Sequence, residues 1–558
     1  MEKRERVTGA GGQPIYVTTW ITDNMWVWVL FWLGILAVAL HLFFKQTYSR
    51  FKKTDVKCPD VVPLLGTSSS LVMKKEHMGD FIMRMYNMYK GERFYGQYFF
   101  LNSVLVIRDI ELVKQITVKD FDSFVDHKVV VDEKMDPIFG RNLVSLKGQE
   151  WRDMRSALSP AFTSSKIKFM VPLMEEVGDE MIKSLKEKMK RKFSDSIDVE
   201  AIDLTTRYAN DVIASCAFGL KVNSAAETNN IFYKMGRQVT KFSFSFMLKI
   251  FMFMYMPIVT RFFDIKFLPK ATTDFFTDTI LNTMREREER NIYRPDMIHL
   301  LLEAKKGKLV HEDKSAKDLD AGFATVEESA VGKKEVQRVW SEGDLVAQAV
   351  MFLLAGFETV STAMSFAVHE LAVNLDVQDK LLEEIKKNEA ENGGKLDYNT
   401  IQNMTYMDMV VSEVLRLWPP GVTLDRMCTK DYNLGKANKD STKDFYVRKG
   451  ENVNIPVFAF HRDPNFFWNP LKFDPERFSE ENKHKILPFT YMPFGIGPRN
   501  CIGSRFALCE VKVMLYQLLK HFKLSPCEET CIPVQLDKDA FGFKIKGGHW
   551  VKLTRRDA

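Results

Sequence analysis

One cysteine near the C-terminus stands in a context that constrains the fold more than any other feature of the chain. Cys501 follows the glycine-rich stretch Phe494-Gly-Ile-Gly-Pro-Arg-Asn, and an apolar, helix-like run begins at Ser504. Glycines let the backbone pass close to a flat ligand. Backbone amides aimed at the sulfur, with a helix N-terminus behind it, stabilise a thiolate. The pattern predicts a loop that presents Cys501 to a ligand.

A thiolate held in this way can be the axial ligand of a haem iron. Arg499 could pair with a haem propionate, because its planar guanidinium matches a carboxylate. The alternative is a buried structural cysteine, a common fate of a single Cys. The stretch from Phe494 to Gly503 resembles the Phe-x-x-Gly-x-Arg-x-Cys-x-Gly loop of the cytochromes P-450 and matches it at each position. That resemblance implies haem b as the cofactor, Cys501 as its iron ligand, and Phe494 and Gly503 beside it.

The composition of the 558 residues allows a large core and an apolar cavity, since 46% are hydrophobic, including 43 Phe and 28 Met. A net charge of +6 suits acidic partners or anionic lipid and falls short of a nucleic-acid binder. Seven cysteines without a C-x-x-C spacing argue against a disulfide framework and against a zinc site. The catalytic part is therefore expected to face a reducing compartment.

The N-terminal region contains twenty residues, Met25 to Phe44, without Asp, Glu, Lys or Arg. As a helix they would span about 30 Å, enough to cross a bilayer. Basic residues follow from Lys45 but are absent from residues 7–24, which places the C-terminal side in the cytosol. A cleaved signal peptide is the alternative, but no small-residue cleavage site follows. We expect a lumenal tail (1–24), a transmembrane anchor (25–44), a basic, proline-rich linker (45–66) and a cytosolic domain (67–558).

The rest of the chain predicts mainly helix with small sheets. Phe94 to Arg108 predicts a hairpin, and Phe541–Lys546 with His549–Leu553 predicts another around Gly547-Gly548. Amphipathic helices are expected over Lys166–Lys190, Ala201–Phe218, Ala271–Arg290, Ser341–Ala372, Val377–Asn388, Tyr406–Trp418 and Ser504–Leu519. Residues 305–339 are charged and predict a mobile surface connection. The resemblance implies the P-450 fold, α+β with small sheets, after one transmembrane helix.

Ala355-Gly-Phe-Glu-Thr359 lies inside the long apolar helix, where Gly356 costs about 1 kcal/mol relative to Ala. Gly356 would let haem or oxygen approach the backbone. Thr359 can bond a carbonyl four residues earlier and open a polar gap for water, with Glu358 beside it as a proton source. An ordinary buried helix is the alternative. The stretch resembles the family's Ala/Gly-Gly-x-Asp/Glu-Thr motif, although Val360 replaces a second hydroxyl and leaves the proton route open.

Glu413-Val-Leu-Arg416 places an acid and a base on one helix face. Such pairs are mostly exposed and worth little, but the apolar neighbours here predict burial. A buried pair needs further hydrogen bonds, and Arg477 is the candidate third member. The three residues resemble the family's Glu-Arg-Arg triad, whose role is structural.

Three further residues resemble propionate contacts of the family. Trp151 and Arg155 have i,i+4 spacing on a helix, and Arg426 follows Trp418-Pro-Pro. Arginines that converge on two carboxylates make favourable electrostatics. A surface role for Arg426 is the alternative.

Substrate contacts are expected, by resemblance, from Pro137–Leu143, Phe352 and Ala355, Val422–Leu424, and Phe541. The stretch Phe242–Phe267 is crowded with Phe and Met. It could form an adaptable roof over the site, dip into the membrane, or do both. A plain buried helix is the alternative.

The resemblance implies a membrane-bound monooxygenase of the endoplasmic reticulum, most similar to insect microsomal members that detoxify xenobiotics. It would use dioxygen and NADPH-derived electrons from NADPH–cytochrome reductase, with a cytochrome b-type donor as a second candidate, to oxidise lipophilic substrates. One alternative is a haem-binding sensor or carrier without turnover, and another is a peroxide-rearranging isomerase. Glu358 and Thr359 disfavour both, because neither needs a proton relay. We expect no nucleic-acid partner.

Overall fold

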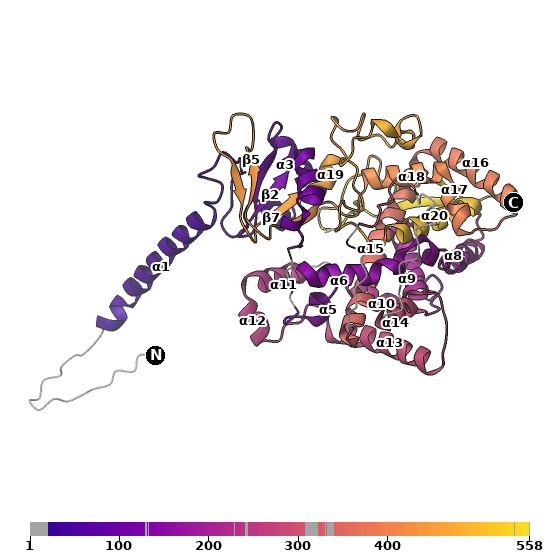
Figure 1. The fold of residues 1–558 in the computed structure, drawn as a ribbon, viewed down its shortest axis with the longest axis horizontal. Coiled ribbons are helices and arrows are strands. Elements are labelled where there is room, and N and C mark those ends of the chain that lie inside the picture. Colours follow the sequence, from indigo (N-terminus) through magenta and orange to yellow (C-terminus); the bar gives the residue numbers. More distant parts are fainter. Residues whose placement is uncertain are drawn as a thin grey trace, which may run out of the picture.

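Helices dominate the chain, and small sheets lie beside them (Figure 1). The computed structural model describes residues 20–128, 131, 133–227, 229–239, 244–306, 322–329, 331, 340–540 and 542–556. The α-helices are α1 (Trp20–Thr47), α2 (Ser69–Val72), α3 (Met78–Met88), α4 (Ile110–Lys114), α5 (Pro137–Gly140), α6 (Gly148–Leu158), α7 (Ser164–Lys168), α8 (Val171–Arg191), α9 (Ala201–Phe218), α10 (Ile231–Val239), α11 (Phe244–Tyr255), α12 (Pro257–Phe262), α13 (Lys270–Glu289), α14 (Met297–Lys305), α15 (Glu342–Val373), α16 (Leu375–Asn392), α17 (Tyr398–Asn403), α18 (Thr405–Leu417), α19 (Val457–Phe460) and α20 (Ser504–His521). The strands are β1 (Phe94–Phe99), β2 (Asn102–Ile107), β3 (Ser196–Glu200), β4 (Leu424–Met427), β5 (Tyr432–Gly435), β6 (Phe445–Val447), β7 (Asn452–Ile455), β8 (Phe522–Ser525) and β9 (Trp550–Arg555).

The long helix α15 runs through the helical part and packs against α5, α9, α18 and α20. Ser341 and Asp344 form a capping box at its start, which satisfies two of the unpaired helix-end amides. Its length and apolarity would suit a membrane span, but 67% of the apolar window is buried. It is therefore a core helix, and the elements around it form the site.

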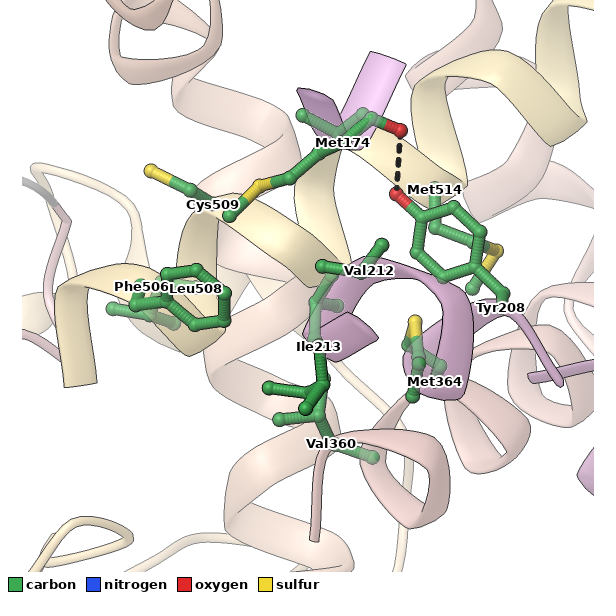
Figure 2. Packing of buried hydrophobic residues seen from close by; sticks show 14 of the residues in the cluster. Met174, Tyr208, Val212, Ile213, Val360, Met364, Phe506, Leu508, Cys509 and Met514 are labelled. Atoms are coloured by element: carbon green, nitrogen blue, oxygen red, sulfur yellow. Dashed lines mark hydrogen bonds between the residues drawn. The ribbon is translucent and has the colours of Figure 1, made fainter. Parts of the chain in front are cut away.

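Figure 2 shows the packing where α9, α15 and α20 meet. Tyr208 of α9 donates its hydroxyl hydrogen to the Met174 carbonyl of α8 at 3.3 Å. Ile213 of α9, Val360 of α15 and Phe506 of α20 pack in the same region (Figure 2), and these three side chains also line a cavity beside Cys501. The core thus builds one wall of the site.

The described residues form three sheets beside the helices. The largest has the order β1-β2-β7-β4, in which only β2 and β7 are parallel. The others have the orders β3-β9-β8 and β5-β6. The four-stranded sheet and β5 lie towards one end of the molecule in Figure 1, where a second hydrophobic cluster surrounds them. Arg426 of β4 extends from this sheet towards the cysteine loop.

The predicted helix over Ala201–Phe218 and the hairpin within Phe94–Arg108 are confirmed. The predicted helix Lys166–Lys190 is divided into α7 and α8, because Pro172 in the first turn of α8 has no N–H to continue a helix. The predicted C-terminal hairpin is wrong, since β9 pairs with β3 and β8. Burial of Val551 and Leu553 beside the apolar residues of β8 favours these distant partners.

Helix α1 projects away from the rest of the molecule, and its side chains from Trp26 to Phe43 are exposed (Figure 1). Residues Trp26–Thr47 are long and apolar enough to span a membrane. The expected linker, residues 45–66, packs on the body of the protein, because Tyr48, Phe51 and Val56 are buried in the cluster around the four-stranded sheet. Residues 1–19 lie outside the part that the structure describes.

The expected mobile connection, residues 305–339, is described at 305–306, 322–329 and 331 only. The segment Gly322–Ser329, called here the docked segment, packs on the body of the protein. Ala324 is buried in the main core, and the ring of Phe323 lies 5.0 Å from Phe478 and 5.5 Å from Tyr491. This part of the connection is therefore held in place, contrary to the prediction.

The Phe- and Met-rich stretch forms α11 and α12, which lie near the same end of the molecule as α1 (Figure 1). Phe253 is buried, and Phe267 packs on Phe139 at 4.4 Å. In contrast, Ile258 and Phe262 of α12 are 80% and 81% exposed. A plain buried helix is therefore excluded for α12.

Candidate active site

A cavity of about 300 Å³ lies between α15, α9 and the cysteine loop. Its walls are apolar, and Thr359 carries the only hydroxyl among the lining residues that the structure describes. The lining includes Phe352, Ala355, Gly356, Thr359, Val360 and Ala363 of α15, Ile213, Cys216 and Ala217 of α9, and Pro493, Phe494, Gly495, Cys501, Ile502 and Gly503 of the loop. No carboxylate or basic side chain is part of this described lining. Such a cavity favours an apolar ligand.

The cysteine loop is shaped by close backbone contacts. The Cys501 N–H donates to the Phe494 carbonyl at 2.8 Å, which closes the loop. Gly497 has a φ of +75°, and a Cβ there would lie 1.9 Å from the Thr117 carbonyl oxygen, so only glycine fits. Helix α20 starts at Ser504. The predicted glycine loop before a helix is present.

The Cys501 side chain is exposed although the residue lies deep in the protein, because it opens onto the cavity. Burial raises the pKa of the Cys501 thiol, and the Gly503 N–H and the charge of Arg155 counteract it. Glu328 of the docked segment raises this pKa further. A thiolate here needs a positive partner, and a haem iron in the cavity would be one.

Two buried arginines, Arg426 and Arg499, lie near the loop, and the described residues leave part of the Arg426 guanidinium without a partner. Arg426 is 1% exposed, donates to the Asp425 and Ile496 carbonyls at 2.7 and 3.3 Å, and has a buried Nε with no hydrogen-bond partner among the described residues. Burial lowers the pKa of Arg426 to about 10, and burial with the neighbouring Arg426 charge lowers the pKa of Arg499 to about 9. Asp126, 3.7 Å from Arg499, and Asp425 oppose these shifts. The unsatisfied Nε–H of Arg426 can still donate to a further anionic partner, and a carboxylate of a haem would be one. The surface alternative for Arg426 is excluded.

Arg499 donates to the carbonyls of Val125, Leu143 and Leu146 at 2.8, 3.2 and 2.8 Å. Its guanidinium also lies 4.0 Å from the centre of the buried Trp151 ring. Trp151 and Arg155 both belong to α6. The fixed stacking of Arg499 on Trp151 joins α6 to the loop.

Arg155 has partners other than the predicted propionate. Its guanidinium donates to the Asn500 carbonyl at 2.7 Å, to the Asn500 side chain at 2.8 Å and to both carboxylate oxygens of Glu328. These contacts engage Nε, Nη1 and Nη2 of Arg155, and its propionate contact stays a prediction. In this structure Arg155 binds the residue that precedes Cys501.

The predicted proton-relay residues lie at the middle of α15. Thr359 opens onto the cavity and donates its hydroxyl hydrogen to the Ala355 carbonyl. A Cβ on Gly542 would lie 3.6 Å from a carboxylate oxygen of Glu358, which places that carboxylate near the C-terminal loop. Gly356 lines the cavity, and a Cβ there would lie 2.5 Å from Ile213. Close packing of α15 on α9 is thus one reason for this glycine.

The predicted triad is joined and fully buried. Arg416 donates to the two Glu413 oxygens at 2.7 and 2.9 Å, and Arg477 donates to Glu413 at 3.2 Å. Arg416 also donates to the His461 carbonyl at 2.6 Å, and the His461 ring accepts from the Met492 N–H at 2.9 Å. These bonds offset the cost of burying three charges and connect α18 to the chain that enters the cysteine loop.

The expected substrate contacts are found in part. Phe352, Ala355 and Leu424 line the cavity, as the resemblance implies. The other predicted contacts, residues 137–143 and 422–423, are not among the lining residues that the structure describes. Phe541 lies outside the described residues. The expected contacts that line the cavity therefore come from α15 and from the start of β4.

Three residues beside the loop were not found from the sequence. The His127 ring shares a hydrogen bond of 2.8 Å with Asp425, and burial and the charges of Arg426 and Arg499 lower the pKa of His127, against the opposing effect of Asp425. Asn500 and Glu328 bind Arg155. The one signal in the sequence was the position of Asn500 next to Cys501, because His127 and Glu328 lie far away along the chain.

A cysteine that opens onto an apolar cavity together with a helix threonine, with buried arginines packed behind its loop, is the arrangement of a haem-thiolate protein. A sequence model of the family described as Cytochrome P450 matches residues 56–551, and the chain belongs to that family. Membership supports a monooxygenase with a haem cofactor, a redox partner, dioxygen and a small-molecule substrate.

Insect proteins are among the similar relatives, as the sequence predicts. Cytochrome P450 9e2 of Blattella germanica is 41% identical over 96% of this chain and 99% of its own length. Probable cytochrome P450 9f2 of Drosophila melanogaster is 39% identical over 95% of this chain and 100% of its own. Cytochrome P450 6j1 of Blattella germanica is 34% identical over 93% of this chain and 96% of its own.

Proposed function

We propose that this protein is a membrane-bound haem-thiolate monooxygenase that uses NADPH-derived electrons to oxidise lipophilic substrates. The observation that carries the proposal is that Cys501 and Thr359 open onto the same apolar cavity. A sensor or carrier would need the cysteine alone. The additional hydroxyl fits a site that delivers protons during turnover.

The residues of the chain would hold the cofactor from several sides. Cys501 would ligate the iron of haem b, while Phe494, Gly503 and Gly356 border the cavity in which it fits. Arg426 and Arg499 would pair with its propionates, and Trp151 would fix Arg499 from behind. The bound haem supplies the iron at which dioxygen is reduced, with the thiolate favouring O–O cleavage.

Thr359 would position a water molecule in the cavity. Its hydroxyl bonds the Ala355 carbonyl, and its oxygen can still accept a hydrogen bond from water. Glu358 would supply protons to this water from the side of the C-terminal loop. In the overall reaction one oxygen atom enters the substrate and the other leaves as water. NADPH supplies two electrons and one proton, and the second proton comes from the solvent.

The cavity lining supports a lipophilic substrate, because burying an apolar molecule there gains about 25 cal/mol for each Å² removed from water. Xenobiotics fit this description, and the resemblance to insect microsomal members supports a detoxifying role. Screening lipophilic compounds for a spectral shift of the haem would identify the compounds that bind.

We place the protein in the endoplasmic reticulum membrane with residues 67–558 in the cytosol. The exposed apolar helix α1 supports a span, and the exposed Ile258 and Phe262 of α12 would add a second contact with the lipid surface. In sealed microsomes, added protease should remove a C-terminal tag and spare an N-terminal tag. Protection of the C-terminal tag would contradict this orientation.

The activity is tested in membranes that contain the full-length protein and NADPH–cytochrome reductase. With isotopically labelled dioxygen, one labelled atom should enter a lipophilic substrate for each NADPH consumed in coupled turnover. Binding of substrate without NADPH-dependent labelling would favour a sensor or carrier. Rearrangement of an added peroxide without NADPH would favour the isomerase.

A further inference from the structure

We propose that Glu328 is a positioning residue for the cysteine loop, because it holds Arg155 against the residue before Cys501. The inference rests on the proposed role of Cys501 as the iron ligand. Glu328 belongs to the docked segment Gly322–Ser329, which the sequence predicts to be part of a mobile connection.

Arg155 is held between Glu328 and Asn500. Arg155 is 3% exposed and binds Glu328 with Nε at 3.1 Å and Nη2 at 2.7 Å. The same guanidinium donates to the Asn500 carbonyl and side-chain oxygen at 2.7 and 2.8 Å. In return, the Asn500 amide donates to the Glu327 carbonyl at 2.8 Å. Asn500 is therefore held by Arg155 and by the docked segment together.

The peptide unit between Asn500 and Cys501 is hydrogen-bonded on both sides. Its carbonyl accepts from Arg155 at 2.7 Å, and its N–H donates to the Phe494 carbonyl at 2.8 Å. A peptide plane fixed at both ends also fixes the Cα of the next residue. Without the Glu328 carboxylate, the buried Arg155 would lose its counter-charge and its fixed direction. The position of Cys501 would then be less defined.

The docked segment has a second anchor away from Arg155. The Phe323 N–H donates to Asp408 at 2.8 Å, and Asp408 pairs with the buried Lys512 at 3.0 Å. Gly322 has a φ of +107°, and a Cβ there would lie 1.7 Å from an Asp408 oxygen. A side chain at position 322 would therefore displace the segment, Glu328 included, while the side chains of Arg155, Asn500 and Glu328 keep their chemical identity.

Glu327 provides a matched control. It is the adjacent acid and is exposed, and it contacts Asn500 through its backbone carbonyl. Glu327→Gln removes the same charge as Glu328→Gln but leaves the hydrogen bonds to Asn500 intact. A general effect of surface charge would change the haem properties in both variants. Positioning through Arg155 would change them in Glu328→Gln alone.

The experiment uses the full-length, haem-loaded protein with Glu328→Gln, Gly322→Ala and Glu327→Gln. The midpoint potential of the iron should become more positive in Glu328→Gln, because a negative charge near the thiolate is removed. The red-shifted band of the reduced carbon-monoxide complex should decay roughly tenfold faster, the order expected for a lost charged hydrogen bond. Gly322→Ala should also decay faster, and Glu327→Gln should match the wild type.

The proposal is overturned if Glu328→Gln and Glu327→Gln give the same potential and the same decay. It is also overturned if Glu328→Gln lowers only the global unfolding temperature and leaves the potential unchanged, since a merely structural contact would do that. Absence of the red-shifted band in the wild type would instead refute the role of Cys501, and with it this inference.

Discussion

Arg416 and Glu413 form a bidentate pair at 2.7 and 2.9 Å in which both side chains are fully buried. Arg477 shares the same carboxylate, and His461 connects Arg416 to the chain before the cysteine loop. The pair therefore links the stability of the core to the position of the haem ligand.

Arg416→Ala should yield little or no haem-loaded protein. Loss of the arginine leaves Glu413 buried and short of a partner, which costs about 3–5 kcal/mol. That is a large share of a typical stability of about 5–15 kcal/mol. Haem content and thermal unfolding measure the effect. Arg191→Ala removes an arginine from an exposed pair and should change neither.

Thr359→Ala should release more peroxide for each NADPH consumed while substrate binding changes little. Removing the hydroxyl disturbs the proposed water, and positioned proton transfer contributes about 10²–10⁴-fold to a rate. Thr359→Ser keeps the hydroxyl and should restore much of the coupling. Coupling as tight in the alanine variant as in the wild type would assign proton delivery to Glu358 alone.

Glu510→Gln should stabilise the protein above mildly acidic pH. Glu510 is fully buried, both carboxylate oxygens lack a hydrogen-bond partner among the described residues, and burial raises its pKa well above the ordinary value. Above the unfolded-state pKa of about 4.3, the unfolded chain releases a proton that the folded protein keeps, so stability falls as pH rises towards the folded-state pKa.

Gln removes this penalty, and the gain in unfolding temperature over the wild type should grow from about pH 4 towards neutral pH. Glu187→Gln, on the exposed part of α8, is the control and should show no such trend. A gain that does not depend on pH would mean that Glu510 does not change its protonation on unfolding.

Reversal of Lys166 and Lys168 to Glu should slow reduction by the reductase, most clearly at low salt. Both residues lie on α7, and reductases of microsomal relatives are expected to present acidic surfaces. Screening weakens such steering beyond about 10 Å at 0.1 M salt. Reversal of the exposed Lys386 on α16 is the control. Equal loss of peroxide-driven turnover would indicate misfolding and not a docking defect.

The sequence predicts best where a local pattern decides the structure. The period of Ala201–Phe218 and the capping residues Ser341 and Asp344 are local, and both predictions are confirmed. The C-terminal hairpin is wrong because β9 finds its partners in β3 and β8, and β3 lies far away in the chain. Long-range pairing of this kind leaves no local pattern.

In the site, too, the residues of local motifs are predictable from the sequence and the long-range contacts are not. The short motif around Cys501 and the stretch Ala355–Thr359 are visible in the sequence, and both contribute residues to the cavity lining. The partners of Arg155 are not visible, because Glu328 comes from a connection whose composition suggests disorder. Tertiary contacts, and not composition, hold the docked segment in place.

The central claim is that Cys501 is the thiolate ligand of the haem iron, and the reduced carbon-monoxide spectrum tests it most directly. The wild type should show the strongly red-shifted Soret band, and Cys501→His should lose it. Cys216→Ala, which removes the other thiol that lines the cavity, should keep it. A band that persists in Cys501→His, or disappears in Cys216→Ala alone, would contradict the account.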